Sequence, residues 1–347
     1  MKEQTIRQSA RAALREYLEK VPFLRFEAIE NLKANNEIDF LATLRVQDRT
    51  ILLLAEVKSN GQPRLARQAV YELRYWLTNQ PNSYGVFIAP YITPRAGIIC
   101  EDAGIGYLDF AGNCLLFFDT VYIRQTGAPN SKVQKRDLRS LYSPKAERIL
   151  RALLNEPRRA WKLAELARTA EVSLGQVANV KKLLLDREWV STTEDGMRLS
   201  NPAALLNEWT QVYNFQRNEA QDFFAMAEIP EVEAILAEVC QRLDMRYALT
   251  GFSSATRIAP MVRYQKSSAY VKGDINPLIE ALNWKAVTSG ANISLLIPYD
   301  DGVFYGTKNI DEITITAPVQ TYLDLQSSRG RGQEAAQAVR KEIEKTW

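Results

Sequence analysis

The sequence predicts a multidomain α/β protein, and three observations support this. Strand-like and helix-like segments alternate over residues 5–123, a compact helical segment follows them, and strand-like segments return in the last third. A chain of 347 residues also exceeds one typical hydrophobic core. We expect an α/β domain over 1–125, a basic linker over 126–142, a helical domain over 143–200 and a second α/β region over 201–347.

The composition is typical of a soluble globular protein and excludes several classes. Hydrophobic residues make up 46% and charged residues 24%, with a net charge of +3, so any DNA binding must come from local patches. No apolar run of about 18 residues is present, and the first 20 residues form an amphipathic pattern without a signal-peptide core. The three cysteines are scattered, which argues against disulfides and zinc knuckles. We expect a cytoplasmic protein that does not span a membrane.

The chain contains no histidine. This excludes Ser-His-Asp and Cys-His catalysis and zinc sites ligated by histidine. Any catalysis must use carboxylates, lysine, tyrosine or a hard metal ion held by oxygen atoms.

The elements of the first domain follow from their hydrophobic periods. Residues 5–20 place Ile6, Ala10 and Leu14 on one helical stripe. Alternating or continuous apolar segments predict strands, and the segment that opens with Pro94 predicts a helix. In order, we expect strands at 23–29, 37–46 and 50–57, a helix at 64–77, a strand at 83–89, a helix at 93–103, and strands at 105–110 and 114–123.

Three polar residues mark the ends of two neighbouring strands in this domain. Glu56 and Lys58 follow the apolar run ILLLA, and side-chain alternation places both on one face of the third strand. Asp39 lies on the preceding strand, joined to the third by a short polar turn. Two carboxylates on adjacent strands can hold one Mg²⁺ ion, and a neighbouring lysine can orient a water molecule. The alternative is a simple ion pair at the end of a strand.

This pattern resembles the PD-(D/E)xK nuclease superfamily, which has a restriction-endonuclease-like fold. Ile38-Asp39-Phe40, Glu56-Val57-Lys58 and Gln68 on the following helix carry the resemblance, although Ile38 replaces the proline of the signature. The resemblance implies catalytic roles for Asp39, Glu56, Lys58 and Gln68. It also implies a Mg²⁺ (or Mn²⁺) ion held by Asp39 and Glu56, with Glu16 or Glu19 as weaker candidates on the first helix. A later D-x-x-G-N segment, from Asp109, either lines the same cleft or forms a turn with Asx hydrogen bonds.

The segment 143–200 has the layout of a winged helix-turn-helix. Ser143 and Pro144 begin a helix, a short helix and a longer one follow, and a hairpin turns at Glu194–Gly196. The polar segment before it carries Lys132, Lys135, Arg136 and Arg139.

We expect the third helix of this domain to bury Leu174, Val177, Leu184 and Leu185 and to present polar side chains to DNA. The helix, the wing and the preceding turn supply the candidate DNA contacts, which are Gln176, Asn179, Lys181, Lys182, Arg198, Arg158 and Arg159, with Lys162 as a further backbone contact. The alternative is that the domain binds another protein and its charged helix face is merely solvated.

The region after residue 200 combines a helical stretch to about residue 227, four strand-like segments and two C-terminal helices. Gly251-Phe252-Ser253-Ser254 resembles the phosphate-binding turn of nucleotidyltransferases. The next strand, however, carries no Asp-x-Asp pair, and two-metal transfer chemistry needs those carboxylates. We therefore expect a non-catalytic relative of that fold.

Residues 143–347 resemble the antitoxin of the abortive-infection type IV toxin–antitoxin systems (AbiEi-like). YALTGFSSATRIAP, AYVKG and the tail from Ala317 carry this resemblance. It implies transcriptional regulation through the winged helix and a cognate toxin as a partner.

Two functional hypotheses follow. In the first, a Mg²⁺-dependent endonuclease domain is directed to double-stranded DNA by the winged helix. In the second, the chain is an antitoxin-type transcriptional regulator whose nuclease-like domain is inactive. The sequence does not decide whether the chain is an enzyme or whether it forms a homodimer.

Overall fold

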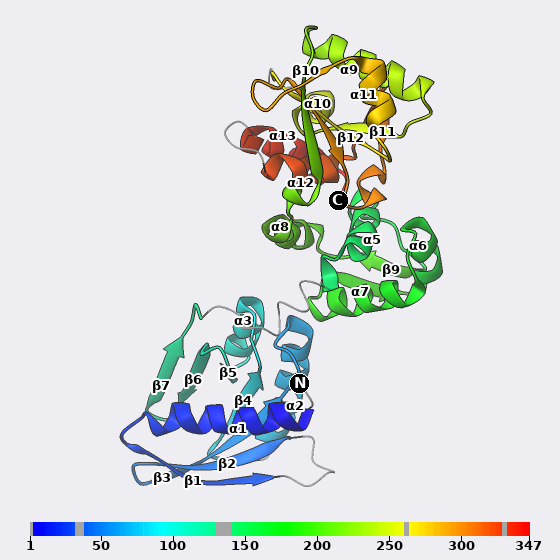
Figure 1. Cartoon of the computed structure of the whole chain (residues 1–347). Coiled ribbons are helices and arrows are strands. Elements are labelled where there is room, and N and C mark those ends of the chain that lie inside the picture. The colour runs from blue at the N-terminus through cyan, green and yellow to red at the C-terminus, as the bar shows by residue number, and fades with distance from the viewer. Residues whose placement is uncertain (1–2, 32–37, 79, 129–139, 260–263, 328–331) are drawn as a thin grey trace. The chain divides into compact units, whose positions relative to one another are not determined.

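The computed structural model describes the chain except residues 1–2, 32–37, 79, 129–139, 260–263 and 328–331 (Figure 1). Internal contacts divide the chain into two compact units. The first contains Met1–Arg139 and Leu183–Glu188, and the second contains Ser140–Lys182 and Trp189–Trp347. Among the described residues, no helix has the length and apolar character needed to cross a membrane.

The first unit is built on one seven-stranded mixed sheet whose strands follow the order of the sequence. The β1–β2–β3 and β5–β6–β7 neighbours are antiparallel, whereas β4 lies parallel to both β3 and β5. The strands are β1 (Leu24–Asn31), β2 (Phe40–Val46), β3 (Arg49–Val57), β4 (Ser83–Ala89), β5 (Gly106–Asp109), β6 (Cys114–Phe118) and β7 (Val121–Gln125).

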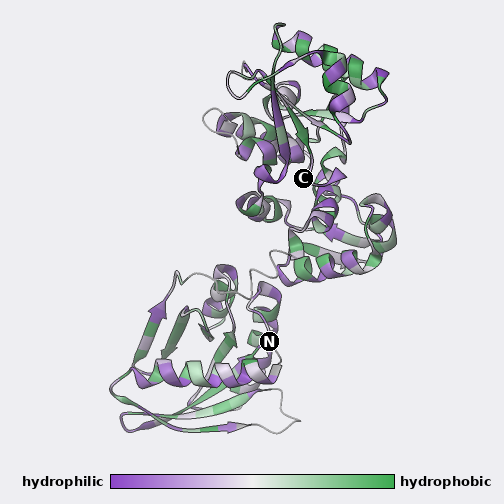
Figure 2. Ribbon diagram, in the orientation of Figure 1, coloured by the Kyte–Doolittle hydropathy of each residue, from purple (hydrophilic) through white to green (hydrophobic). Residues whose placement is uncertain are grey.

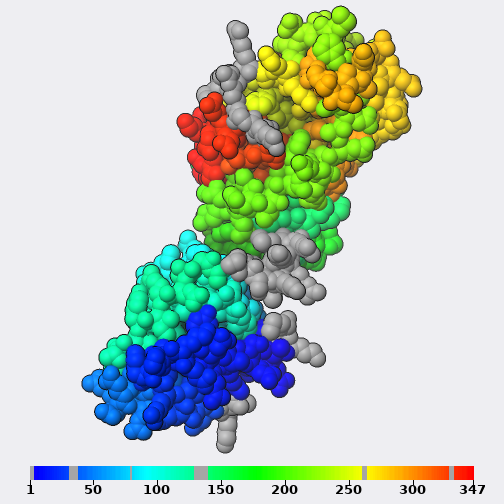
Figure 3. Space-filling view, turned by 60° about the vertical axis from the view of Figure 1, so that its left-hand side comes forward, coloured from blue at the N-terminus to red at the C-terminus, as the bar shows by residue number. Residues whose placement is uncertain are grey.

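Helices cover both faces of this sheet. The helix α1 (Glu3–Glu19) buries Ile6, Ala10 and Leu14 with the inward side chains of β2 and β3 in one core cluster. On the opposite face, α2 (Pro63–Leu77) and α3 (Pro94–Asp102) form a second cluster that includes Leu54. Within the described residues, the predicted helices and the first five predicted strands are confirmed, but 114–123, expected as one strand, forms the antiparallel hairpin of β6 and β7 with a turn at Asp119 and Thr120. Figure 2 shows α1 banded in hydrophobic and hydrophilic colours, and Figure 3 shows the blue N-terminal segment on the outer surface of this unit.

The second unit begins with three helices and a hairpin. These are α5 (Pro144–Asn155), α6 (Leu163–Thr169), α7 (Leu174–Asp186), whose last residues belong to the first unit, β8 (Val190–Thr193) and β9 (Gly196–Leu199). Trp161 is fully buried and bridges to Met197 of the hairpin through two backbone hydrogen bonds. Leu174, expected in the core, is 54% exposed instead, because it is the first residue of α7 and lies beyond the packed face.

The rest of the second unit is a seven-stranded sheet with the order β13-β10-β14-β12-β11-β16-β15. The four predicted strands are confirmed, but residues 219–224, which we placed in a helical stretch, form a strand. The strands are β10 (Glu219–Phe224), β11 (Tyr247–Thr250), β12 (Ser267–Val271), β13 (Lys285–Ala286), β14 (Ile293–Ile297), β15 (Lys308–Ile310) and β16 (Ile313–Ile315).

The helices of this part are mostly α-helical, with two short 3₁₀ turns. They are α8 (Pro202–Val212), η1 (Phe215–Arg217), α9 (Ile229–Arg242), α10 (Gly251–Ile258), α11 (Asn276–Leu282), η2 (Asp301–Phe304), α12 (Pro318–Gln326) and α13 (Gly332–Glu344). Arg151 of α5 is fully buried and donates two hydrogen bonds to Gln320 of α12, so buried polar contacts join the three-helix segment to the C-terminal part.

Candidate active site

The predicted polar residues of the first unit meet at one end of β3. Phe40, the first residue of β2, pairs with Ala55, so Asp39 lies next to the end of β3. The Val57 N–H donates to Asp39 Oδ2 at 2.8 Å, which fixes this carboxylate against the strand. Glu56 is the penultimate residue of β3, and Lys58 follows directly after the strand. The sequence prediction that these three residues come together is confirmed.

Lys58 joins two carboxylates that come from different elements. Its Nζ lies 2.7 Å from Glu56 Oε1 and 2.6 Å from Glu72 Oε2 of α2. Gln68, one helical turn before Glu72, donates to Glu72 Oε1 at 2.8 Å. Gln68 thus reaches the cluster through Glu72, a residue that the sequence reasoning missed. Gln68 and Glu72 are four residues apart and so lie on the same face of the helix. This spacing is the sequence signal that could have identified Glu72.

Glu56 is the most unusual group in the cluster. It is only 4% exposed, and its Oε2 atom is buried without a hydrogen-bond partner among the described residues. Burial raises the pKa of Glu56 to about 8, although Lys58 acts in the opposite direction. Buried carboxyl oxygens in folded proteins normally have a partner. An orphaned oxygen beside a lysine therefore fits a carboxylate that binds a cation.

The pKa values of the neighbouring groups depend on the same contacts. Burial lowers the pKa of Lys58, but its bonds to Glu56 and Glu72 outweigh that effect and raise the pKa overall. Burial raises the pKa of Glu72, and the hydrogen bonds from Lys58 and Gln68, together with the charge of Lys58, lower it by more. Lys58 therefore stays protonated and Glu72 ionised near neutral pH, while Glu56 is the group that exchanges a proton there.

Asp39 already has a cationic neighbour. Arg7 of α1 places Nε 2.6 Å from Asp39 Oδ1, and its side chain is 46% exposed, whereas that of Asp39 is only 6% exposed. The arginine side of this ion pair is therefore open to solvent, whereas the carboxylate is shielded.

The residues fit one oxygen-bound cation. Among the described residues, no group of three or more acidic or cysteine side chains is arranged around a metal-sized gap. Asp39 and Glu56 would therefore supply two carboxylates, with water completing the shell, as is usual for Mg²⁺.

Two of the weaker candidates lie elsewhere. Glu16 and Glu19 are exposed and pair with Lys20 and Arg15 of their own helix, because the i,i+4 spacing brings those charges together. Asp109 is buried and its Oδ1 accepts hydrogen bonds from the backbone N–H groups of Ala111, Gly112 and Asn113. The turn interpretation of this D-x-x-G-N segment is therefore correct.

Some of the candidate DNA contacts of the second unit are exposed to solvent, and others are bound to protein groups. Lys182, Arg198 and Asn179 are exposed, and Asn179 donates to Ser140 Oγ at 2.9 Å, while Gln176 and Lys181 are half-buried. Arg158 donates to the carbonyl of Trp347, at 3.0 Å through Nε. The linker cations Lys132, Lys135, Arg136 and Arg139 lie outside the described residues.

Arg159 contacts side chains of its own domain. Its guanidinium lies 3.9 Å from the ring centroid of Trp161 and pairs with Glu156 and Glu165. Arg158 and Arg159 therefore have internal partners that a phosphate would have to replace.

The turn that resembles a phosphate-binding loop is filled by protein groups. Ser253 and Ser254 are fully buried, and their hydroxyls bond to Ser267 and Thr321. The two serine hydroxyls of this turn therefore already have protein partners.

Comparison with known proteins gives two results. Residues 198–345 match the family of AbiEi antitoxins, transcriptional regulators of type IV toxin–antitoxin systems. The match begins near the end of the hairpin, so it covers less than the predicted 143–347. No curated protein matches the chain.

Solved structures also resemble part of the chain. A repair endonuclease from Pyrococcus abyssi is 14% identical over 29% of this chain and 46% of its own, with a TM-score of 0.22. EndoMS in its apo form is 15% identical over 29% and 45%, with a TM-score of 0.23, and an EndoMS–dsDNA complex is 20% identical over 29% and 44%, with a TM-score of 0.21. The chain spans less than half the length of these proteins.

Proposed function

We propose that the first unit is a Mg²⁺-dependent DNA endonuclease with a restriction-endonuclease-like fold. The observation that carries the proposal is the buried Glu56 carboxyl group, with one orphaned oxygen, beside Lys58 and Asp39. A bound divalent cation would supply positive charge to the scissile phosphate and lower the pKa of a bound water. Asp39 and Glu56 would hold that cation.

The other residues of the cluster have positioning roles in this proposal. Lys58 holds its ammonium group at the carboxylates, where it orients the attacking water and stabilises negative charge on the phosphate. Glu72 fixes Lys58 from the α2 side, and Gln68 fixes Glu72. Because the chain contains no histidine, the carboxylates of this cluster are the candidate bases near neutral pH.

We further propose that residues 143–200 form a winged helix-turn-helix that directs the endonuclease to double-stranded DNA, with residues 201–347 as a non-catalytic nucleotidyltransferase-like domain. The helix–helix–helix–hairpin order and the exposed Lys182 and Arg198 support this assignment. In this proposal the nuclease-like domain covers 1–125, the basic linker 126–142, the winged helix-turn-helix 143–200 and the C-terminal domain 201–347.

Incubation of the full chain with plasmid and linear DNA, with Mg²⁺ or Mn²⁺, tests the endonuclease. The wild type should cleave, EDTA should stop cleavage, and Lys58→Ala should abolish it. The matched control is Lys272→Ala, which removes an exposed lysine of the second unit. Equal cleavage by the wild type and Lys58→Ala would contradict the proposal.

The match of residues 198–345 favours a second candidate, an antitoxin-type transcriptional regulator. In that case the chain would bind DNA upstream of its own gene and a cognate toxin, and Glu56 would be idle. A gel-shift assay with that upstream DNA at moderate salt tests it, because nonspecific complexes dissociate as salt rises. Absence of a specific complex would rule this candidate out.

A further inference from the structure

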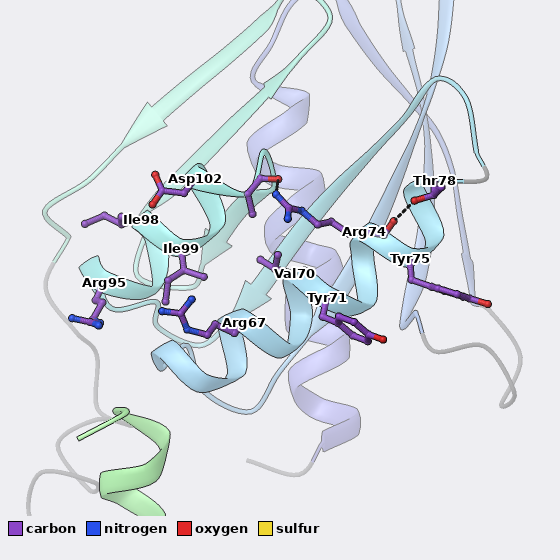
Figure 4. A pocket seen from close by; sticks show the side chains of 11 residues that line it. Arg67, Val70, Tyr71, Arg74, Tyr75, Thr78, Arg95, Ile98, Ile99 and Asp102 are labelled. Atoms are coloured by element: carbon purple, nitrogen blue, oxygen red, sulfur yellow. Dashed lines mark hydrogen bonds between the residues drawn. The ribbon is translucent and has the colours of Figure 1, made fainter. Parts of the chain in front are cut away.

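A groove on the outer surface of α2 and α3 combines arginines with exposed tyrosines (Figure 4). Its volume is about 810 Å³. Three arginines and one aspartate line it, so its charge is positive, and two tyrosines and two isoleucines add apolar surface. The side chains that matter here are Arg67, Tyr71, Arg74, Tyr75, Arg95 and Ile98.

The tyrosines of this groove are more exposed than aromatic residues normally are. Tyr71 is 78% exposed and Tyr75 is 61% exposed, and they lie one helical turn apart on α2. Figure 4 shows both rings pointing away from the helix. Tyr75 also packs edge-on against Trp76, with ring centroids 5.8 Å apart, which restricts its rotation. Flat rings held outward at this spacing are suited to stacking against nucleic-acid bases.

The arginines can contact phosphates without losing their present contacts. Arg74 donates one N–H to the Ala103 carbonyl, and Arg67 donates Nε–H to Glu188 of the same unit. A guanidinium carries five N–H donors, so both keep donors for a ligand. Arg95 is exposed, and among the described residues no ion pair or hydrogen bond engages its side chain.

The groove and the candidate active site use neighbouring positions of α2. Tyr71 is three residues after Gln68, and Tyr75 is three residues after Glu72, so each tyrosine neighbours a member of the Lys58 cluster on the helix surface. A strand bound along the tyrosines would therefore lead to the carboxylates.

We propose that this groove binds a DNA strand with unpaired bases, with Tyr71 and Tyr75 stacking on the bases and Arg67, Arg74 and Arg95 contacting phosphates. Positive charge complements the phosphate backbone, and exposed rings complement base faces that a duplex hides. The inference rests on the proposed function in one respect, namely that the strand held here is the substrate of the Lys58 cluster.

Fluorescence anisotropy with a labelled single-stranded oligonucleotide and its duplex, in EDTA and at several salt concentrations, tests the proposal on the full chain. The double variant Tyr71→Ala/Tyr75→Ala should bind the single strand at least about tenfold more weakly, since each stacked base contributes about 1–3 kcal/mol. Its affinity for the duplex should stay within about twofold of the wild type. Tyr122→Ala, which removes a tyrosine that is 67% exposed on β7, is the matched control and should bind like the wild type.

A second pair of variants tests the charge. Arg95→Glu should weaken single-strand binding and reduce its salt dependence, whereas Arg25→Glu, at an exposed position of β1, should change neither. Single-strand affinity unchanged by the tyrosine variant would overturn the proposal, as would an equal loss for the duplex. Failure here leaves the Lys58→Ala cleavage test unaffected, whereas equal cleavage by Lys58→Ala contradicts the endonuclease whatever the groove binds.

Discussion

Glu56 in the first unit and Asp324 in the second both carry a buried carboxyl group. They differ in the number of hydrogen bonds that their oxygen atoms accept. Burial raises the pKa of both, to about 8 for Glu56 and to about 6 for Asp324. Asp324 accepts hydrogen bonds from Tyr213, Thr250, Tyr270 and Gln320. Glu56 has one ionic partner, Lys58, and an oxygen without a hydrogen bond.

The difference separates a structural carboxylate from one suited to chemistry. Hydrogen bonds to both Asp324 oxygens offset part of the cost of burying the charge and leave neither oxygen without a partner, although burial still raises the pKa. The contact with Lys58 offsets only part of the free energy needed to bury the charge of Glu56. Carboxyl groups in such an environment are typical of ligand-binding and catalytic sites. Substitutions at these two carboxyl groups and at the neighbours of Glu56 test this contrast.

The largest effect should be on cleavage by Glu56→Gln. Glutamine keeps the size of the side chain but cannot bind a divalent cation with a charged oxygen, so cleavage should fall by about a thousandfold or more. Initial rates on supercoiled DNA with Mg²⁺ measure this loss. Glu30→Gln, at an exposed position of β1, should keep full activity. Undiminished cleavage by Glu56→Gln would remove Glu56 from the mechanism.

Asp324→Asn should destabilise the second unit by about 2–3 kcal/mol, because an amide donor would face hydroxyls that now donate to the carboxylate. Chemical denaturation followed by tryptophan fluorescence measures the change in the free energy of unfolding. Asp195→Asn, in the exposed hairpin turn, is the control. A loss of less than about 0.5 kcal/mol would show that the network around Asp324 contributes little.

Glu56→Gln should instead stabilise the first unit, by about 1–2 kcal/mol at pH 8. The unfolded carboxyl group ionises near its ordinary pKa of 4.5, and the folded one near 8. Between these values the folded state binds more protons, so rising pH lowers the stability of the wild type, and the variant lacks this loss. Thermal melts at pH 5 and pH 8 should therefore show a small gain at pH 5 and a larger one at pH 8. A gain that does not change with pH would contradict the assignment of the raised pKa to Glu56.

Gln68→Ala should have the smallest effect, a few-fold loss of cleavage. Gln68 is exposed and acts only through Glu72, which keeps its direct contact with Lys58. Glu72→Gln should cost more than Gln68→Ala, because it removes the charge that holds Lys58. If Gln68→Ala abolished cleavage while Glu72→Gln did not, Gln68 would contact substrate directly rather than through Glu72.

The order of helices and strands along most of the first unit, the pairing of its second and third strands and the meeting of Asp39, Glu56 and Lys58 could be predicted from the sequence. Alternation fixes which face each strand residue occupies, and a short turn fixes which strands pair. Glu72 and Arg7 could not be assigned in the same way, since their partners depend on which helix face meets the end of the sheet.

The second unit shows where local patterns fail. The strand β10 reads EAQDFF, and only Phe223 in it is fully buried, so it lacks the alternation that predicts a strand. It pairs with β14 and β13, which are distant in sequence, and those contacts decide its conformation. Arg158 likewise contacts the carbonyl of Trp347, a partner that no local pattern indicates.

Mn²⁺ binding, measured by titration calorimetry in buffers of different ionisation enthalpy, tests most directly whether Glu56 is a cation-binding carboxylate. The wild type should bind one Mn²⁺ in the first unit at pH 7 and release close to one proton, because the cation displaces the proton held by Glu56 below its pKa of about 8. Glu56→Gln should lose both the binding and the proton release. Equal Mn²⁺ binding by the two proteins, or wild-type binding without proton release, would contradict the account.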